Sequence, residues 1–341
     1  MDISLFDFQL PIELIAQHPP KERLDSRLLV YHRSTKMIED KMFKDIPQYL
    51  TSNDVLIRNN TKVIPARLYG VKPETNAHVE LILLDDLGEG RYRCLVGNAK
   101  VVKVNTFLTF GDGRLTATCQ SVEEEGLRIL QFHYQGVFLE VLESLGEIPL
   151  PPYIREQLHD KDRYQTVYAK VPGSAAAPTA GFHFTQDLFT SLTRQGIQVE
   201  DITLQIGLGT FKPVKALNTQ DHVMHIERYT IEADVANRLN VAKQAGKRLV
   251  AIGTTSCRTL EASLSKHPQF VGESSQTNLF ITPGYTFQAI DALITNFHLP
   301  KSTLVMLVSA FIGREEMLRV YQHAIDHRYR FFSFGDAMLI L

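Results

Sequence analysis

Cysteine is scarce in this sequence. The 341 residues include Cys94, Cys119 and Cys257, and no two of these form a C-x-x-C pair. An odd, dispersed set of cysteines argues against a disulfide scaffold and against a zinc ribbon. The expected compartment is therefore a reducing cytoplasm.

The sequence also lacks an excess of positive charge and a long hydrophobic run. Lys plus Arg is 36 and Asp plus Glu is 38, so the formal net charge is −2. The whole chain has no basic signature for nucleic acid, although a local basic patch is compatible with this balance. The longest apolar stretch, 304–312, is too short to span a bilayer. The segment 1–11 has two acids and no basic region, so we expect neither a signal peptide nor a membrane partner.

Two regions of the chain differ in their sequence pattern. Residues 63–150 contain short β-rich runs at roughly ten-residue spacing, which is typical of a small all-β barrel or sandwich. After Pro149 strands and helices alternate, as in α/β folds. We therefore predict an α/β fold in which a larger α/β domain, residues 1–62 and 151–341, carries an inserted, smaller all-β barrel domain, residues 63–150.

Three helix starts are predicted from capping residues. Thr185, Ser256 and Ser302 each precede an apolar-periodic segment, and a hydroxyl there can accept from a free backbone N–H. We predict helices over 137–146, 185–196, 232–246, 256–264 and 302–313, and strands over 27–31, 54–60, 247–255, 291–297 and 331–341.

The run GSAAAPTAGFHFT, residues 173–185, is unusually rich in small residues. Small side chains let a ligand or another backbone approach closely, and Pro178 blocks a regular helix. Both a tight-packing loop and a ligand-binding surface fit this composition. His183, between Phe182 and Phe184, fits a buried core histidine or an acid–base group.

Three further segments place polar groups where a predicted strand ends, which is where ligands bind in open α/β sheets. These residues are Gly207 and Gly209 in QIGLGTFKPV, Thr254, Thr255 and Ser256 in IGTTSCRTLE, and Asn296 and His298 in TNFHLPKST. Each group alone also fits an ordinary turn or helix cap.

The segment HVMHIERY contains His222, His225 and Glu227. Its H-x-x-H-x-E spacing differs from the H-E-x-x-H motif of zinc enzymes. We therefore predict no metal site. We expect this segment to form a polar side of the binding site, with one histidine that acts as an acid or a base.

Long, specific blocks recur along the whole chain, among them NNTKVIPARL, GEIPLPPYI, RYQTVYAKVPGSAAAPTAGFHFT, QIGLGTFKPV, HVMHIERY, TNFHLPKSTLVMLVSAF and YRFFSFGDAMLI. Together they resemble the S-adenosylmethionine:tRNA ribosyltransferase-isomerases of queuosine biosynthesis. Phe182, Lys212 and Ile226 stand where that family more often has Leu, Arg and Ser.

The resemblance implies a transferase that consumes S-adenosylmethionine as ribosyl donor and needs no prosthetic group. The ribosyl moiety is transferred to 7-aminomethyl-7-deazaguanine at the tRNA wobble position and isomerised, giving epoxyqueuosine with release of adenine and methionine. The implied fold is an α/β domain with a β-barrel domain. The expected partners are that tRNA and the donor, and the expected state is a monomer.

This chemistry assigns roles to residue types. The sulfonium acidifies the ribose 5′ carbon, so a base must remove a proton there, and histidine suits neutral pH. His183 is the first candidate and His225 the second, while Glu147 could orient the amine or the cation. Aromatic faces at Phe182 and Phe184 suit a sulfonium. The predicted donor pocket comprises Ala176, Ala180, Phe182, Phe184, Gly207, Gly209, Thr254, Thr255, Ser256, Asn296 and His298.

Binding of tRNA must use local positive charge. The candidates are Arg58, Arg67, Arg155, Arg163 and Lys212. Two other functions are open, an RNA-binding module and an S-adenosylmethionine-dependent methyltransferase acting on RNA. Residues 1–60 show no glycine-rich strand–turn–helix for a methyltransferase, and a binding module leaves the acid–base residues unexplained. Release of adenine and methionine distinguishes the first function from both.

Overall fold

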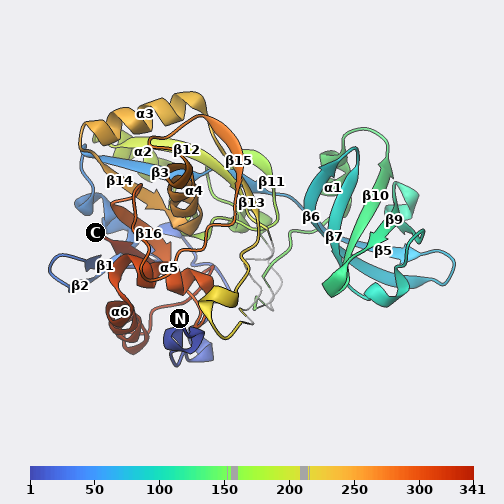
Figure 1. The fold of residues 1–341 in the computed structure, drawn as a ribbon, viewed down its shortest axis with the longest axis horizontal. Helices are drawn as coiled ribbons and strands as arrows, with labels where there is room; N and C mark the ends of the chain where they lie inside the picture. The colour runs from blue at the N-terminus through green and yellow to red at the C-terminus, as the bar shows by residue number, and fades with distance from the viewer. Residues whose placement is uncertain (152, 155–159, 208–213, 215) are drawn as a thin grey trace.

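A mixed nine-stranded sheet forms the larger part of the molecule (Figure 1). The computed structural model describes residues 1–341 except 152, 155–159, 208–213 and 215. Within the described chain the strand order is β15-β13-β12-β3-β14-β16-β17-β1-β2. These strands are β1 (Arg27–His32), β2 (Met37–Met42), β3 (Asp54–Asn59), β12 (Gln198–Gln205), β13 (Glu227–Ile231), β14 (Arg248–Ile252), β15 (Glu273–Thr277), β16 (Ala292–Asn296) and β17 (Ala337–Ile340).

The centre of the sheet is parallel and buried on both faces. β12, β3, β14 and β16 pair in parallel, and β13 and β15 join by antiparallel pairs. β17 pairs antiparallel with β16 and parallel with β1. β3, β14 and β16 are therefore buried along almost their whole length, whereas buried and partly exposed residues alternate along β12. Helices α3 (Ala233–Gln244), α4 (Gly253–Lys266), α5 (Thr303–Ile312) and α6 (Arg314–Asp326) pack on one face, and α2 (Gln186–Arg194) packs on the other.

The second part is a closed six-stranded barrel, which Figure 1 shows beside the α/β part. Its strand order is β10-β7-β6-β5-β8-β9, and all its pairs are antiparallel. The strands are β5 (Arg67–Lys72), β6 (Ala77–Gly88), β7 (Arg91–Val96), β8 (Phe107–Phe110), β9 (Leu115–Val122) and β10 (Leu127–Tyr134). Helix α1 (Phe138–Leu145) follows and places Leu142 in the barrel core. The predicted fold class, α/β with a smaller all-β barrel, is confirmed.

A short parallel pair, β4 (Thr61–Val63) with β11 (Val171–Ser174), lies where the chain leaves the large sheet for the barrel and where it returns. No helix in the described part of the chain is both long and apolar enough to cross a membrane.

Two of the three predicted helix caps are confirmed. Thr185 Oγ1 accepts from Leu188 N at 3.1 Å, and Ser302 Oγ accepts from Val305 N at 3.2 Å. The prediction for Ser256 is wrong, because α4 already begins at Gly253. Gly253 adopts φ +88°, a left-handed conformation that favours glycine, so the chain turns directly from strand into helix.

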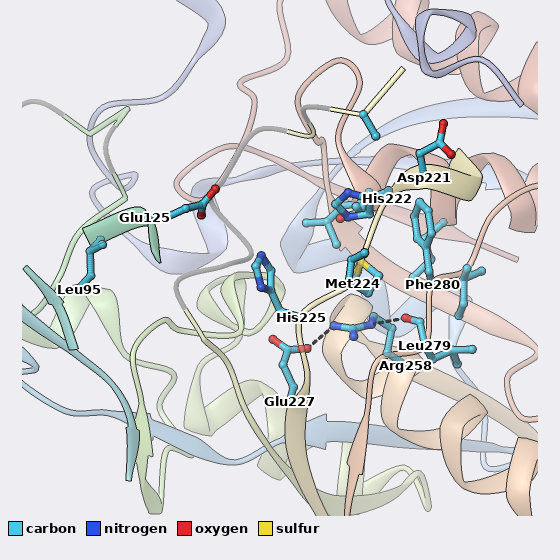
Figure 2. A pocket seen from close by; sticks show the side chains of 16 residues that line it. Leu95, Glu125, Asp221, His222, Met224, His225, Glu227, Arg258, Leu279 and Phe280 are labelled. Carbon is cyan, nitrogen blue, oxygen red and sulfur yellow. Dashed lines mark hydrogen bonds and ion pairs between the residues drawn. The ribbon is translucent and has the colours of Figure 1, made fainter. Parts of the chain in front are cut away.

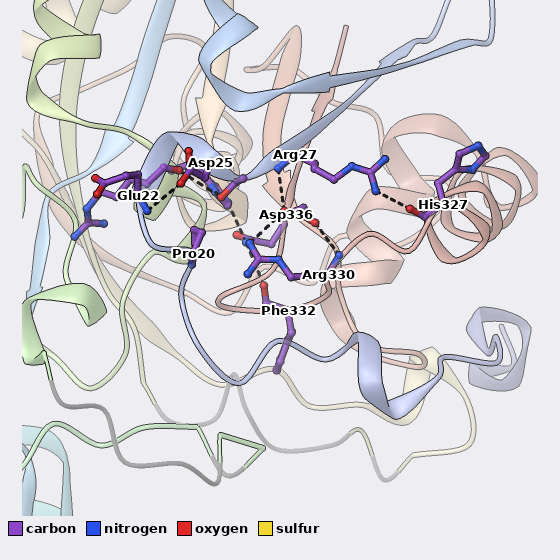
Figure 3. Close-up of polar contacts among 12 residues, drawn as sticks. Pro20, Glu22, Asp25, Arg27, His327, Arg330, Phe332 and Asp336 are labelled. Carbon is purple, nitrogen blue, oxygen red and sulfur yellow. Dashed lines mark hydrogen bonds and ion pairs between the residues drawn. The ribbon is translucent and has the colours of Figure 1, made fainter.

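The carboxylate of Asp336 ties the C-terminal segment to the start of β1 (Figure 3). It is 2% exposed and accepts from the backbone nitrogens of Arg27 at 2.9 Å and Arg330 at 2.8 Å. The predicted strand over 331–341 is therefore shorter, because this segment forms a turn before β17. That turn brings Phe332 and Ser333 to the crevice described below.

Candidate active site

A cavity of about 750 Å³ lies between the barrel and the α/β part (Figure 2). Leu95 and Glu125 line it from the barrel, and segment 221–227 with helices α4 and α5 lines it from the α/β part. This volume is typical of a site for a small molecule or cofactor. The cavity is therefore large enough for a nucleoside-sized ligand.

An ion pair forms part of the cavity wall. Arg258 on α4 and Glu227 at the start of β13 are 6% and 5% exposed, and Arg258 Nη1 donates to Glu227 Oε2. Arg258 Nε also donates to the carbonyl of Leu279 at 3.2 Å. Figure 2 shows both contacts. A buried charge needs such partners, and the pair therefore fixes the guanidinium in place.

The two histidines of HVMHIERY both line this cavity. His225 is exposed, and its ring is directed into the space (Figure 2). The His222 ring packs edge-on against Phe280 at 5.1 Å, and burial together with the charge of His225 lowers its pKa. His225 is therefore the cavity histidine that a substrate can reach most freely.

A narrow crevice of about 50 Å³ adjoins the cavity, and Leu304 lines both. Six residues of the predicted donor pocket line the crevice, namely Ala176, Ala180, Thr254, Thr255, Asn296 and His298. Thr254, Thr255, Asn296 and His298 meet because β14 and β16 are parallel neighbours, so the residues that end or follow these strands lie at the same sheet edge. Ala176 and Ala180 come from the segment between β11 and α2. Within the described residues Thr255 Oγ1 is buried without a hydrogen-bond partner.

His183 is buried and held at both ring nitrogens. Nδ1 lies 2.8 Å from Ser26 Oγ, and Asn296 Nδ2 lies 3.2 Å from Nε2. Asn296 Nδ2 also donates to the carbonyl of Phe332, which shows that this side-chain atom is the amide nitrogen and not the oxygen. His183 Nε2 therefore accepts from Asn296, and Nδ1 carries the proton of the neutral ring. Burial, with the nearby charges of Arg330 and Arg23, lowers the pKa of His183 to about 3. The neutral ring therefore acts as a fixed hydrogen-bonding group.

Two predicted aromatic residues pack against other rings. Phe184 is fully buried between Phe43 and Phe189, with ring centroids at 4.9 and 4.7 Å. Phe182 lies against Phe334 and Tyr164 in the cluster beside His183. Neither ring lines the cavity or the crevice. Their role in binding a sulfonium stays a prediction.

Four other predicted site residues lie away from the crevice or outside the described residues. Ser256 is buried, and its hydroxyl donates to the carbonyl of Ile252 at 2.9 Å. Glu147 is exposed and pairs through its backbone with Arg67 beside the barrel. Gly207 lines neither space, and Gly209 lies outside the described residues. The proposed role of Glu147 stays a prediction.

The predicted RNA-binding cations that the structure describes all have internal partners. Arg58 pairs with Asp201 at 2.5 Å and lies over the rings of Tyr168 and Phe189. Arg67 pairs with Glu80 at 3.2 Å. The guanidinium of Arg163 donates to the carbonyls of Lys21 and Pro20. Arg155 and Lys212 lie outside the described residues.

Among the described residues, one group of possible metal ligands brings its atoms within 4.8 Å of one another. It comprises Asp40, His323 and His327 on β2 and the end of α6. His323 Nε2 already contacts Asp40 at 3.0 Å, and Tyr329 donates to the same carboxylate. The group lies outside the cavity, and hydrogen bonding within it accounts for its geometry.

The two buried histidines should make the protein sensitive to mild acid. Burial lowers the pKa of both His183 and His298 to about 3. In the unfolded chain each has a pKa near 6.5, so from about pH 6.5 down to about 3 the unfolded state binds more protons. The contribution of the two neutral histidines to the free energy of unfolding is therefore fully present above this pH range. It falls as the pH drops through the range, by up to about 1.4 kcal/mol per pH unit for each histidine.

Urea unfolding of the wild type and of His298→Gln between pH 7 and pH 4.5 measures this effect. The free energy of unfolding of the variant should fall less steeply as the pH drops, by up to about 1.4 kcal/mol per pH unit, because the variant has one buried histidine fewer. Equal slopes in the two proteins would contradict the assignment of His298 as a neutral buried group.

The parallel sheet, the cavity beside its carboxyl edge and the appended barrel define a two-part α/β enzyme. The chain belongs to the queuosine biosynthesis protein family, whose sequence model matches residues 3–340. It is also similar to the crystal structure of an S-adenosylmethionine tRNA ribosyltransferase from Thermotoga maritima. The two sequences are 37% identical, the match covers 99% of this chain and 100% of that one, and the TM-score is 0.55.

Proposed function

We propose that this enzyme transfers and isomerises the ribosyl moiety of S-adenosylmethionine onto 7-aminomethyl-7-deazaguanine at the tRNA wobble position, giving epoxyqueuosine. The family match over residues 3–340, together with the similarity to a tRNA ribosyltransferase along the full chain, carries this proposal. The cavity of about 750 Å³ supports it, because a small-molecule donor and an extruded base need a space of this size.

His225 is the proposed base for the ribose 5′ proton. Among the proposed catalytic residues it is the one that lines the cavity, and it is exposed there. A pKa near 3 makes His183 a weak base at neutral pH. We assign His183 instead to positioning Asn296, whose side chain lines the crevice. The amine then attacks in its deprotonated form, and adenine and methionine leave.

The barrel region, residues 63–150, is proposed to be an inserted domain that closes one side of the donor site. Glu125 and Leu95 from the barrel face the α/β part across the cavity, which supports this role. The tRNA would then reach the donor where the two parts meet. The enzyme is proposed to act as a monomer in the cytoplasm, and its three buried free cysteines suit a reducing compartment.

Release of free adenine is the direct test. Purified protein incubated with S-adenosylmethionine and tRNA carrying the aminomethyl base should release adenine and methionine in equal amounts. S-adenosylhomocysteine should not form, because no methyl group is transferred. Chelator should leave the rate unchanged, whereas complete loss of activity restored by zinc would contradict the metal-free reaction. Formation of S-adenosylhomocysteine would replace the proposal with a methyltransferase.

A further inference from the structure

The guanidinium of Arg258 has one nitrogen that no protein group satisfies. Nη1 donates to Glu227 and Nε donates to Leu279, but Nη2 has no hydrogen-bond partner among the residues that the structure describes. Arg258 is 6% exposed and lines the large cavity. A buried cationic N–H group without an acceptor is costly, so the site is suited to an acceptor that a ligand brings.

The geometry favours a carboxylate on a small molecule. An arginine whose Nε and Nη1 are already fixed presents its remaining N–H groups in a defined plane, which suits a carboxylate or a phosphate. Arg258 belongs to a helix of the α/β part and forms the buried wall of the cavity. A phosphodiester of a folded RNA stays at the surface when its base is extruded, so it does not reach such a depth.

Access to Nη2 requires a small adjustment at this wall. The atom itself exposes less than 1 Å². Met224 lines the same part of the cavity, and Figure 2 shows its side chain beside Arg258. Methionine has three rotatable bonds and adapts at low cost to a ligand.

We propose that Arg258 binds the carboxylate of the methionine part of S-adenosylmethionine. This inference rests on the proposed function and names the protein group that anchors one end of the donor. With the carboxylate at Arg258, the sulfonium lies within the cavity and the adenosyl group extends toward Leu304 and the crevice. The carboxylates of Glu227 and Glu125, on the same cavity, favour the donor's positive charges.

Decarboxylated S-adenosylmethionine tests this directly on the wild-type enzyme. Its affinity, measured by calorimetry, should be lower than that of the donor by roughly tenfold to a hundredfold, the scale of a hydrogen bond to a charged group. With saturating tRNA, its KM should rise by a similar factor and kcat should change little, because the carboxylate is remote from the reacting carbon. Equal affinity for the two donors would overturn the proposal.

Variants then test whether Arg258 causes the preference for the carboxylated donor. Replacing Arg258 alone leaves Glu227 buried without its partner, so the test variant is Arg258→Gln combined with Glu227→Gln. The matched control is Glu227→Gln alone, which keeps the guanidinium. The control should retain the preference for the carboxylated donor, and the double variant should bind both donors equally. A preference that persists in the double variant would place the carboxylate elsewhere.

The readouts separate this inference from the proposed function. Adenine release by the wild type with no preference between the donors would overturn only the role of Arg258. Binding that shows the preference without any adenine release would support the carboxylate site and contradict the ribosyl transfer. Absence of donor binding, both alone and with tRNA, would overturn both. Circular dichroism and melting curves confirm that each variant is folded.

Discussion

Replacing His225 with alanine is expected to lower the single-turnover rate of adenine release by about a hundredfold or more, the usual scale for a general base. The imidazole is exposed on the cavity wall, so its removal takes away a proton acceptor without disturbing a packed core. The rate should be measured at saturating donor and tRNA, where a lost proton transfer appears in kcat. Affinity for S-adenosylmethionine should change little.

Two histidine variants serve as comparisons. His133→Ala changes an exposed residue of the barrel strand β10 and should turn over like the wild type. His183→Ala removes a buried, doubly hydrogen-bonded ring, so it should melt earlier, and its folded fraction should lose less than His225→Ala. Normal turnover by His225→Ala, with a large loss in His183→Ala, would show that His183 is the base.

The division into an α/β part and a barrel could be predicted because each part has its own periodicity. Barrel strands face a core on one side and solvent on the other, so their buried and exposed residues alternate, whereas β3, β14 and β16 are buried on both faces. Helix α6 was not predicted, because its polar sequence follows α5 after a single glycine. The cap at Ser256 was wrong because the glycine conformation that starts α4 depends on the preceding strand.

The crevice could be predicted in outline from local sequence. Thr254, Thr255, Asn296 and His298 follow strands, and parallel pairing brings such strand ends together. The state of His183 could not be predicted, because its burial and its contact with Ser26 come from segments distant in sequence. A sequence pattern gives a residue type, whereas a pKa depends on the complete tertiary environment.

The roles of the predicted phosphate-binding arginines also depend on tertiary contacts that the sequence does not give. Arg58 and Arg163 have the residue type that binds phosphate, but their partners are provided by the protein itself. Arg258 was present in the quoted block IGTTSCRTLE and was not singled out. The sequence signal was a charged residue within a helix that is rich in small and hydroxyl side chains, which indicates a buried partner but does not identify it.

Filling the crevice should remove donor binding. Ala180 is 3% exposed and lies beside Gly253, with Ala176 on the same crevice. In Ala180→Leu and Ala176→Leu the added carbons occupy a space of about 50 Å³. Overpacking costs roughly 1–3 kcal/mol, so the variants should be less stable but still folded. We expect affinity for S-adenosylmethionine to fall by more than about a hundredfold, because steric exclusion removes most of the contacts at this end of the donor.

The control must overpack the protein equally without touching the crevice. Ala236→Leu on α3 meets this condition, since Ala236 is 1% exposed and lies in the core beneath that helix. It should lower the melting temperature to a similar degree and leave donor affinity and tRNA affinity unchanged. Melting temperature, donor affinity by calorimetry and tRNA affinity should be measured on all three variants. If Ala180→Leu and Ala176→Leu bind the donor like Ala236→Leu, the run of small residues is a tight-packing loop, and the donor lies wholly within the larger cavity.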